Sequence, residues 1–254
     1  MIEFKEVYKS FGDRQVLRGF SLSVQDGETV VILGYSGSGK SVALKHVVGL
    51  LEPDAGEVIV DGEVVHQLDR EGLTRLRAKI GFVFQFAALL DSMTVRENLE
   101  LGLKRRGLSR AEIDERIKEA LELVDLEDVE DRYPAELSGG MRKRVGIARA
   151  IALRPRYILY DEPTTGLDPV TSAVIDRLIV RAREKLNVTG LVVTHDLRSA
   201  YTVADRIALL YQGRIRQVGS VESIRNSHDP VVRQFIEGRP EALADVEQAA
   251  GGVR

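Results

Sequence analysis

A buried strand, a glycine-rich loop and a helix follow one another near the start of the chain, and this succession constrains the fold more than any other feature. Residues 29–33 are mostly β-branched and apolar, which predicts a strand buried on both faces, as in a parallel sheet. Residues 34–41, Gly-Tyr-Ser-Gly-Ser-Gly-Lys-Ser, match the pattern G-x-x-x-x-G-K-[ST]. Apolar residues spaced by three and four from Leu44 to Leu51 predict a helix, which Pro53 is expected to end.

Each residue type in the loop has a physical role in binding phosphate. Glycines let the backbone curl so that its N–H groups point inward at an anion, and the helix N-terminus adds positive potential. Lys40 supplies a full charge to β- and γ-phosphates, and the Ser41 hydroxyl can ligate Mg²⁺. A glycine- and serine-rich surface turn is the alternative, but such a turn does not require a strand before it and a helix after it. The predicted phosphate-binding residues are Gly34, Ser36, Gly37, Ser38, Gly39, Lys40 and Ser41.

Strand and helix patterns alternate through much of the remaining chain. Residues 157–160, 191–194 and 207–211 are short apolar runs typical of strands, with helical patterns between them, which predicts a parallel α/β sheet. Strand-like alternation before residue 33 and a hairpin signal at Asp61-Gly62 predict an additional antiparallel β subdomain.

Residues 86–150 differ from this pattern and are expected to form an inserted helical subdomain. Ser109 and Glu112 have the spacing of a capping box, and the apolar residues that follow mark one face of a helix. The predicted core then comprises residues 1–85 and 151–237, and residues 238–254 form a C-terminal tail rich in Ala, Glu and Gly.

An acidic pair follows the predicted strand at 157–160. Because the carboxyl ends of parallel strands line the ligand crevice, Asp161 can reach the shell of a Mg²⁺ ion, usually through water. Glu162 would then lie beside the γ-phosphate, where it can polarise an attacking water. Many strands end in Asp or Glu, so the pair takes its meaning from the loop at 34–41.

Two further polar residues follow predicted strands. His195 comes after the run 191–194, where it could hydrogen-bond the γ-phosphate and align the water with Glu162. Gln85 follows the run 80–84, where its amide could touch Mg²⁺ or the water. A lone histidine is more often structural or exposed, and a lone glutamine is an ordinary polar strand end.

Composition excludes several classes of protein. Net charge is −3, from 36 basic and 39 acidic residues, and this even balance argues against a nucleic-acid partner. With no cysteine, the chain has no disulfide scaffold, thiolate zinc site or cysteine nucleophile. We find no apolar run long enough to cross a bilayer and no signal peptide, so we expect a cytoplasmic protein that reaches a membrane only through a partner or a surface contact.

Residues 137–141, Leu-Ser-Gly-Gly-Met, open a helical pattern about twenty residues before the acidic strand. They resemble the signature Leu-Ser-Gly-Gly-Gln of the ABC ATPase family, and the resemblance extends over roughly residues 1–235. Physically this is a second helix N-terminus with a serine and two glycines, which is again an anion site. An ordinary N-cap at Ser138 is the alternative interpretation, but the spacing of the other motifs favours the family.

The resemblance implies a P-loop NTPase core with an ATPase activity that one copy cannot perform alone. Two copies would pair head to tail, with ATP and Mg²⁺ between the phosphate loop of one and Ser138, Gly139 and Gly140 of the other. Phe11 matches the aromatic residue that stacks on adenine, and Asp168 the acidic residue of a loop between subunits. Gln85 and His195 match the family's glutamine and histidine positions. Integral-membrane permease subunits would dock near Gln85, holding the ATPase on the cytoplasmic face of the inner membrane.

Met141 departs from the family signature, because glutamine is usual there. Signatures ending in Ser-Gly-Gly-Met resemble those of the Mla- and Mce-associated ATPases, which move phospholipid, and residues 86–90 and 229–238 resemble the same members. This narrower resemblance implies a phospholipid or a related hydrophobic cargo and an accessory lipid-binding protein. Tyr35 is unusual in the phosphate loop, and the sequence offers no function for it.

Three alternatives remain open at this point. An ABC importer for another cargo, such as amino acids, would share the same nucleotide machinery. A soluble ABC ATPase of DNA repair or cluster assembly is disfavoured, because DNA-repair members usually carry coiled-coil or zinc insertions, which this chain lacks. A nucleotide-binding module without activity is disfavoured because Glu162 and His195 are both present.

Overall fold

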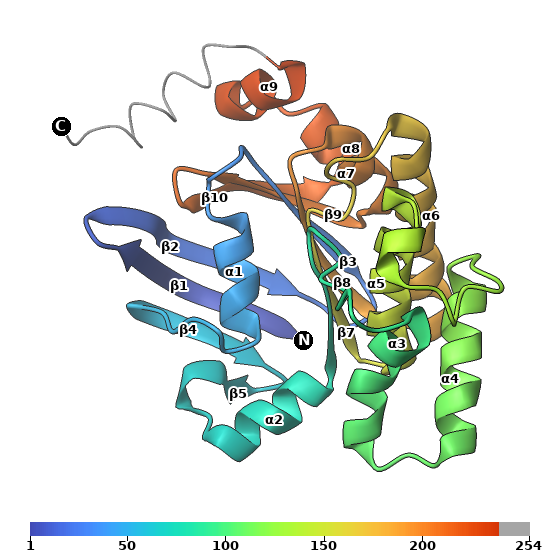
Figure 1. The fold of residues 1–254 in the computed structure, drawn as a ribbon. Helices are drawn as coiled ribbons and strands as arrows, with labels where there is room; N and C mark the ends of the chain where they lie inside the picture. The colour runs from blue at the N-terminus through green and yellow to red at the C-terminus, as the bar shows by residue number, and fades with distance from the viewer. Residues whose placement is uncertain (239–254) are drawn as a thin grey trace. The chain divides into compact units, whose positions relative to one another are not determined.

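The computed structural model describes residues 1–238 (Figure 1). These residues form two compact units. Of the described residues, the first unit comprises 1–73 and 193–238, and the second comprises 74–192. Within the described residues, no helix has the length and apolar character that crossing a membrane requires. The predicted boundaries of core, helical insert and tail stay predictions, and all of the tail except Gly238 lies outside the described residues.

The first unit contains a four-stranded antiparallel sheet in the order β2-β1-β4-β5. Its strands are β1 (Ile2–Phe11), β2 (Arg14–Val24), β4 (Ala55–Val60) and β5 (Glu63–Val64). Phe4 pairs with Leu22 on one side and Val58 on the other, and all three side chains are buried on the same face. Asp61 and Gly62 turn between β4 and β5 with φ of 53° and 84°, so the predicted hairpin is confirmed.

The same unit contains β3 (Thr29–Leu33), β9 (Arg206–Tyr211) and β10 (Arg214–Ser220) side by side. β3 runs parallel to β9, and β10 runs antiparallel to β9. Every residue of β3 is buried, as the apolar run predicts. The helices of this unit are α1 (Lys40–Val47), η1 (Val65–Gln67), α7 (Leu197–Val203), α8 (Val221–Arg225) and α9 (Pro230–Glu237), and α2 (Arg70–Ala78) leads into the second unit.

The expected end of the first helix at Pro53 is wrong, because α1 ends at Val47. Gly49 adopts φ of 63°, a left-handed conformation that glycine enters without steric cost. The Leu50 N–H then donates to the Lys45 carbonyl at 2.9 Å, which satisfies a carbonyl in the last turn. The glycine therefore stops the helix before the proline is reached.

The second unit has parallel strands with helices around them. β6 (Ile80–Val83) lies beside β7 (Tyr157–Asp161), which neighbours β8 (Thr189–Thr194), a strand whose last two residues belong to the first unit. Its helices are α3 (Val95–Leu103), η2 (Lys104–Arg106), α4 (Arg110–Leu123), η3 (Pro134–Glu136), α5 (Gly139–Ala152) and α6 (Pro169–Leu186). The expected α/β class, with an antiparallel β subdomain added to parallel strands, is confirmed.

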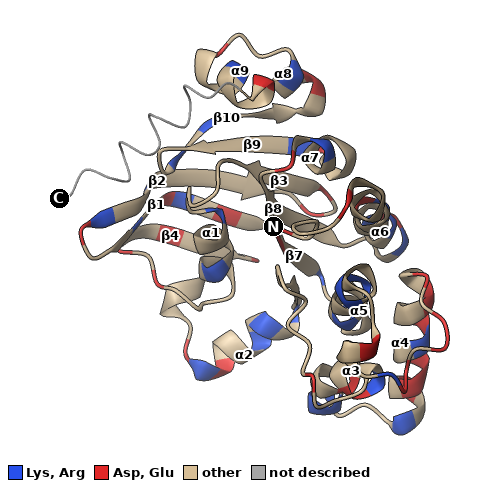
Figure 2. Ribbon diagram, turned by 45° about the horizontal axis from the view of Figure 1, so that its top comes forward, with Lys and Arg blue, Asp and Glu red and all other residues tan. Residues whose placement is uncertain are grey.

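Helix α5 is the centre of the helical part of this unit. α3 and α4 both pack against it, and its apolar residues from Val145 to Ile151 are buried. α4 begins at the predicted capping box: the Ser109 hydroxyl accepts from the Glu112 N–H, and the Glu112 carboxylate accepts from the Ser109 N–H. Both acidic and basic residues lie along α4 (Figure 2).

Candidate functional site

The phosphate loop lies between β3 and α1 in the first unit, and its glycines are required by its shape. Gly37 and Gly39 adopt φ of 75° and 105°, which strains any residue with a side chain. A Cβ on Gly39 would lie 2.7 Å from Val16 Cγ1, and a Cβ on Gly34 would lie 2.7 Å from the Leu210 carbonyl oxygen. The loop can therefore curl this tightly only with glycine at these positions.

The start of α1 fits a phosphate chain. Its N-cap is Gly39, so no side chain caps the first N–H groups of the helix. Lys40 is 4% exposed, and its Nζ donates to the carbonyls of Gly34 and Tyr35 at 2.9 Å each, which holds the ammonium group over the loop. The buried Ser38 hydroxyl has no hydrogen-bond partner within the described residues, a vacancy that a phosphate oxygen can satisfy. These donors suit the phosphates of a nucleotide such as ATP.

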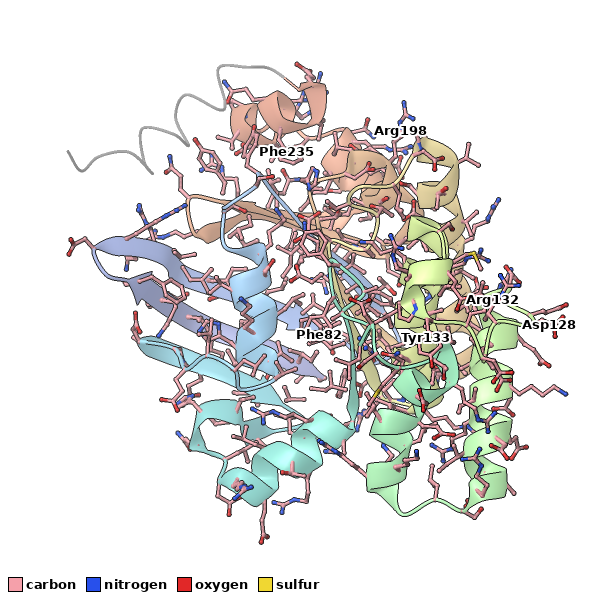
Figure 3. The ribbon with its side chains drawn as sticks, viewed as in Figure 1. Phe82, Asp128, Arg132, Tyr133, Arg198 and Phe235 are labelled. Atoms are coloured by element: carbon pink, nitrogen blue, oxygen red, sulfur yellow. The ribbon has the colours of Figure 1, made fainter. Side chains whose placement is uncertain are left out.

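Two contacts that the sequence did not predict hold the loop. The Tyr35 ring packs edge-on against Phe235 of α9, with ring centroids 4.7 Å apart, and burial raises the pKa of the Tyr35 hydroxyl (Figure 3 labels Phe235). Arg14 Nη2 donates to the Gly37 carbonyl at 3.1 Å. The only sequence signal for the first contact was the unusual aromatic residue inside a glycine-rich loop.

Phe11 and His195 also belong to the first unit. Phe11 ends β1 with 47% of its surface exposed, and Lys9 Nζ lies 5.8 Å from the ring centroid. His195 follows β8 directly and is exposed. The next residue, Asp196, caps α7 by accepting from the Arg198 N–H at 2.8 Å, which fixes the backbone that carries His195.

In the second unit, Gln85 and the acidic pair emerge from neighbouring strands. Val83 of β6 is paired with Tyr160 of β7, so Gln85 and Glu162 each lie two residues beyond a matched position at the same sheet edge. Asp161 is the last residue of β7. The structure therefore brings Gln85, Asp161 and Glu162 to one edge, as the sequence predicts.

Glu162 is held in a conformation that non-glycine residues rarely adopt. Its φ is 48° and it is 8% exposed, and one carboxylate oxygen accepts from the Thr165 hydroxyl at 3.1 Å. Left-handed conformations of this kind cost on the order of 1–3 kcal/mol and persist where the surroundings enforce them, commonly at functional sites. A buried, directed carboxylate suits the polarisation of a water molecule.

Lys143, which the sequence analysis did not single out, lies beside this group. It is 7% exposed, and its Nζ donates to the backbone carbonyl of Gln85. Burial lowers the pKa of Lys143, and the carboxylates of Glu162 and Asp161 act in the opposite direction. In the sequence this lysine stands within Arg-Lys-Arg, which suggests a solvated charge run, so only the tertiary structure reveals its position.

The predicted anion site at residues 138–140 is open at the surface. Ser138 is the N-cap of α5, where its hydroxyl oxygen accepts from the Met141 N–H at 3.2 Å. Ser138 and Gly139 are exposed, and a Cβ on Gly139 would meet no atom within 4 Å. A Cβ on Gly140, in contrast, would lie 2.6 Å from Thr171 Cγ2, so this glycine allows α5 and α6 to approach closely.

Asp168 lies beside this helix start. One depression is lined by residues 138–141 and Arg144 on one side and by residues 166–168 and the first turns of α6 on the other. Asp168 caps α6 by accepting from the N–H groups of Val170 and Thr171 at 2.9 and 3.0 Å. A hydrogen bond from the Thr171 hydroxyl lowers the pKa of Asp168, so it is a charged carboxylate at neutral pH.

The predicted site residues therefore form local groups inside each unit. The phosphate loop, Phe11 and His195 belong to the first, and the Gln85–Asp161–Glu162 edge and the Ser138–Asp168 depression belong to the second. That these groups act on one nucleotide stays a prediction.

Comparison with known proteins gives these groups a common context. Residues 17–165 match the family model described as "ABC transporter". The chain is 40% identical over 239 residues to a probable ribonucleotide transport ATP-binding protein of Mycobacterium leprae, covering 94% of this chain and 69% of the relative. It is 41% identical over 256 residues to the chloroplastic protein Trigalactosyldiacylglycerol 3 of Arabidopsis thaliana, covering 94% of this chain and 74% of the relative.

Two other comparisons bear on cargo and assembly. The chain is 40% identical to the methionine import ATP-binding protein MetN of Brucella abortus, covering 93% of this chain and 64% of the relative. Among solved structures, a dimeric ATP-binding cassette in a post-hydrolysis state bound to ADP and phosphate is 37% identical with a TM-score of 0.79, covering 87% of this chain and 99% of that one.

Proposed function

Since this chain belongs to the ABC transporter family and is an ATPase, the ATP-binding subunit of such a transporter, we propose that two copies close head to tail around ATP and drive a membrane permease that moves phospholipid or a related hydrophobic compound. The observation that carries the proposal is the exposed start of α5, where Ser138 and Gly139 line an open depression. An anion site that faces solvent is available to a nucleotide held by another copy.

In the proposed site, each residue has one task. Lys40 and the N–H groups of the phosphate loop bind the β- and γ-phosphates, and Phe11 stacks on the adenine. Glu162 accepts a hydrogen bond from the attacking water, and His195 aligns that water with the γ-phosphate. Mg²⁺, held by Ser41, Gln85 and, through water, Asp161, would neutralise charge on the phosphates.

The partner copy would complete the site with the start of its α5. The Ser138 hydroxyl oxygen already accepts from the Met141 N–H, so its own proton is left to donate to a phosphate oxygen. Gly139 has no side chain and the space around it is open, so a phosphate can approach the start of the helix. Met141 is not required for these contacts, which come from the serine hydroxyl and the backbone, so its departure from glutamine is compatible with activity.

Glu162→Gln tests the catalytic and dimer parts of this proposal. Glutamine keeps the size of the side chain but loses the negative charge, so we expect ATP to bind without turnover and to trap a dimer visible by size-exclusion chromatography with light scattering. Lys40→Ala is the matched control: it removes the ammonium group from the loop and should abolish ATP binding and the dimer together. Undiminished steady-state hydrolysis by Glu162→Gln would refute the role given to Glu162.

The cargo and the membrane partner form a separate part of the proposal. The residue pattern around Met141 and a relative that bears the name of a galactolipid both favour a lipid. Residues Phe84, Phe86 and Leu90 are large apolar side chains exposed around Gln85, a surface suited to the cytoplasmic helices of a permease at the inner membrane.

Purification from membranes, with identification of bound proteins and lipids, tests the cargo. We expect a polytopic membrane protein and phospholipid, with an accessory lipid-binding protein in the same complex. The second candidate is an amino-acid cargo, which the similarity to a methionine import protein favours. Hydrolysis stimulated by an amino acid and its binding protein, but not by lipid, would select that candidate.

A further inference from the structure

The backbone that follows β6 is fastened to helix α5 at three points. Lys143 Nζ donates to the Gln85 carbonyl. Arg149 reaches two carbonyls further along the chain, with Nη2 donating to Ala87 at 2.8 Å and Nη1 to Ala88 at 2.6 Å. Between these two side chains, a Cβ on Gly146 would lie only 3.3 Å from the Ala87 Cβ, so the glycine lets the loop lie close to the helix. Figure 2 shows the basic residues along α5.

The segment after β6, residues 85–88, depends on these contacts with α5 for its backbone conformation. Lys143, Gly146 and Arg149 are three residues apart and therefore lie along one side of α5. Ala87 and Ala88 adopt φ of 58° and 47°, a left-handed conformation that is unfavourable for residues with a Cβ. Two such residues in succession persist only where surrounding contacts enforce them. The contacts with α5 therefore set the backbone conformation just after Gln85.

Lys143 also interacts electrostatically with two carboxylates, which Arg149 does not. The charges of Glu162 and Asp161 at the end of β7 raise the pKa of the Lys143 ammonium group against the larger effect of burial. A buried cation is costly unless charges or hydrogen bonds compensate it, and here both the Gln85 carbonyl and the two carboxylates do so. One side chain of α5 thus joins the segment after β6 to the acidic end of β7.

We propose that Lys143 is a positioning residue for ATP hydrolysis, which fixes the Gln85 backbone and the Asp161–Glu162 strand end relative to the helix that Ser138 begins. The inference rests on the proposed function and extends it. When the start of α5 meets nucleotide held by the partner copy, Lys143 transmits the position of that helix to Gln85 and Glu162 of its own chain. Nucleotide in one site then orders the catalytic residues of the other.

Three variants separate this role from a purely structural one. Lys143→Met keeps the volume of the side chain and removes both donor and charge. Because it leaves the Gln85 carbonyl and two carboxylates without their cation, it should lower Tm, so kcat is compared on folded chain at a temperature below that transition. Lys143→Arg keeps donor and charge. Lys118→Met, on α4 and exposed to solvent, is the control for loss of a lysine from a helix of the same unit.

We expect kcat of Lys143→Met to fall by about tenfold or more, as for a small misplacement of catalytic groups, with the KM for ATP within about twofold of the unsubstituted chain. Lys143→Arg should recover most of kcat, and Lys118→Met should match the unsubstituted chain. Amide hydrogen exchange of residues 85–88 should be faster in Lys143→Met alone.

A kcat within twofold of the unsubstituted chain in Lys143→Met, or an equal loss in Lys143→Arg, would overturn the positioning role. Unchanged exchange at residues 85–88 in Lys143→Met would overturn the link to Gln85. The exchange measurement needs no turnover, so it tests the inference even if the unsubstituted chain proved unable to hydrolyse ATP, a result that would instead remove the proposed function.

Discussion

Replacing Ser138 with alanine separates two tasks that one hydroxyl is proposed to perform, capping a helix and binding the partner's nucleotide. The chain contains a control, because the Ser109 hydroxyl caps α4 in the same unit by accepting from the third residue of its helix, as the Ser138 hydroxyl does in α5. The Ser138 hydroxyl accepts from the Met141 N–H at 3.2 Å, and the Ser109 hydroxyl accepts from the Glu112 N–H at 3.3 Å. Each serine is the residue before the helix, and each is exposed.

The magnitudes follow from these geometries. Loss of a serine N-cap costs about 1 kcal/mol of stability, so each variant should lower Tm by about 2–4 °C for a chain of this size. Only Ser138 is expected to donate to a phosphate, and a hydrogen bond to a charged group is worth about 1.5–3 kcal/mol. kcat/KM for ATP should therefore fall by about 10- to 100-fold in Ser138→Ala and stay unchanged in Ser109→Ala.

The assay measures ATP turnover and thermal unfolding on both variants at equal concentration. A Ser138→Ala chain with the kcat/KM of the unsubstituted chain would refute the proposed phosphate contact. Equal losses of activity in both variants would also refute it, because the effect would then come from helix stability and not from the nucleotide.

Three other predictions follow from the same structure. Gly39→Ala should lose ATP binding, measured by calorimetry, because φ is 105° there and the new Cβ would lie 2.7 Å from Val16. Gly107→Ala is the control for backbone strain without a clash, because Gly107 has φ of 67° and open space around it. Phe235→Ala should lower the free energy of unfolding by about 3 kcal/mol and weaken ATP binding, because it removes the ring that packs against Tyr35. Phe86→Ala, at a residue 82% exposed, is the control and should change stability little. Equal ATP affinity in Phe235→Ala and the unsubstituted chain would contradict the link to the phosphate loop. A hydrogen bond from Lys104, with nearby Arg110 and Arg96, lowers the pKa of the buried Glu100 carboxyl. The stability that the charged carboxylate contributes is therefore present above the ordinary carboxyl pKa and is lost as pH falls through the lowered value. Acid unfolding of Glu100→Gln should show a smaller loss of stability over that range, and an unchanged pH dependence would contradict this.

Local signals in the sequence were enough to predict the features set by short-range chemistry. The left-handed turns at Gly37 and Gly39, the hairpin at Asp61-Gly62 and the capping box of Ser109 each depend on the local backbone, and the structure shows all three. The end of α1 was wrong because two stop signals compete there, and Gly49 precedes Pro53 along the chain.

The features that the sequence could not predict depend on contacts between distant residues. Lys143 lies in a charged run that suggests an exposed face, and only the packing of α5 against the segment after Gln85 buries it. Tyr35 meets Phe235 across two hundred residues of chain, so neither residue alone indicates the contact. The joining of the phosphate loop, Glu162 and the partner's Ser138 around one nucleotide stays a prediction for the same reason.

Disulfide formation between two single-cysteine chains tests the head-to-tail dimer most directly. The chain has no cysteine, so Ser36→Cys in one copy and Gly139→Cys in another, each also carrying Glu162→Gln, give an unambiguous pair, and position 139 has open space for the new side chain. We predict that mixing the two chains with ATP gives a rapid disulfide between positions 36 and 139, and that omitting ATP prevents it. Cross-links between two copies of the same chain, or a mixed disulfide that forms equally without ATP, would contradict the central claim.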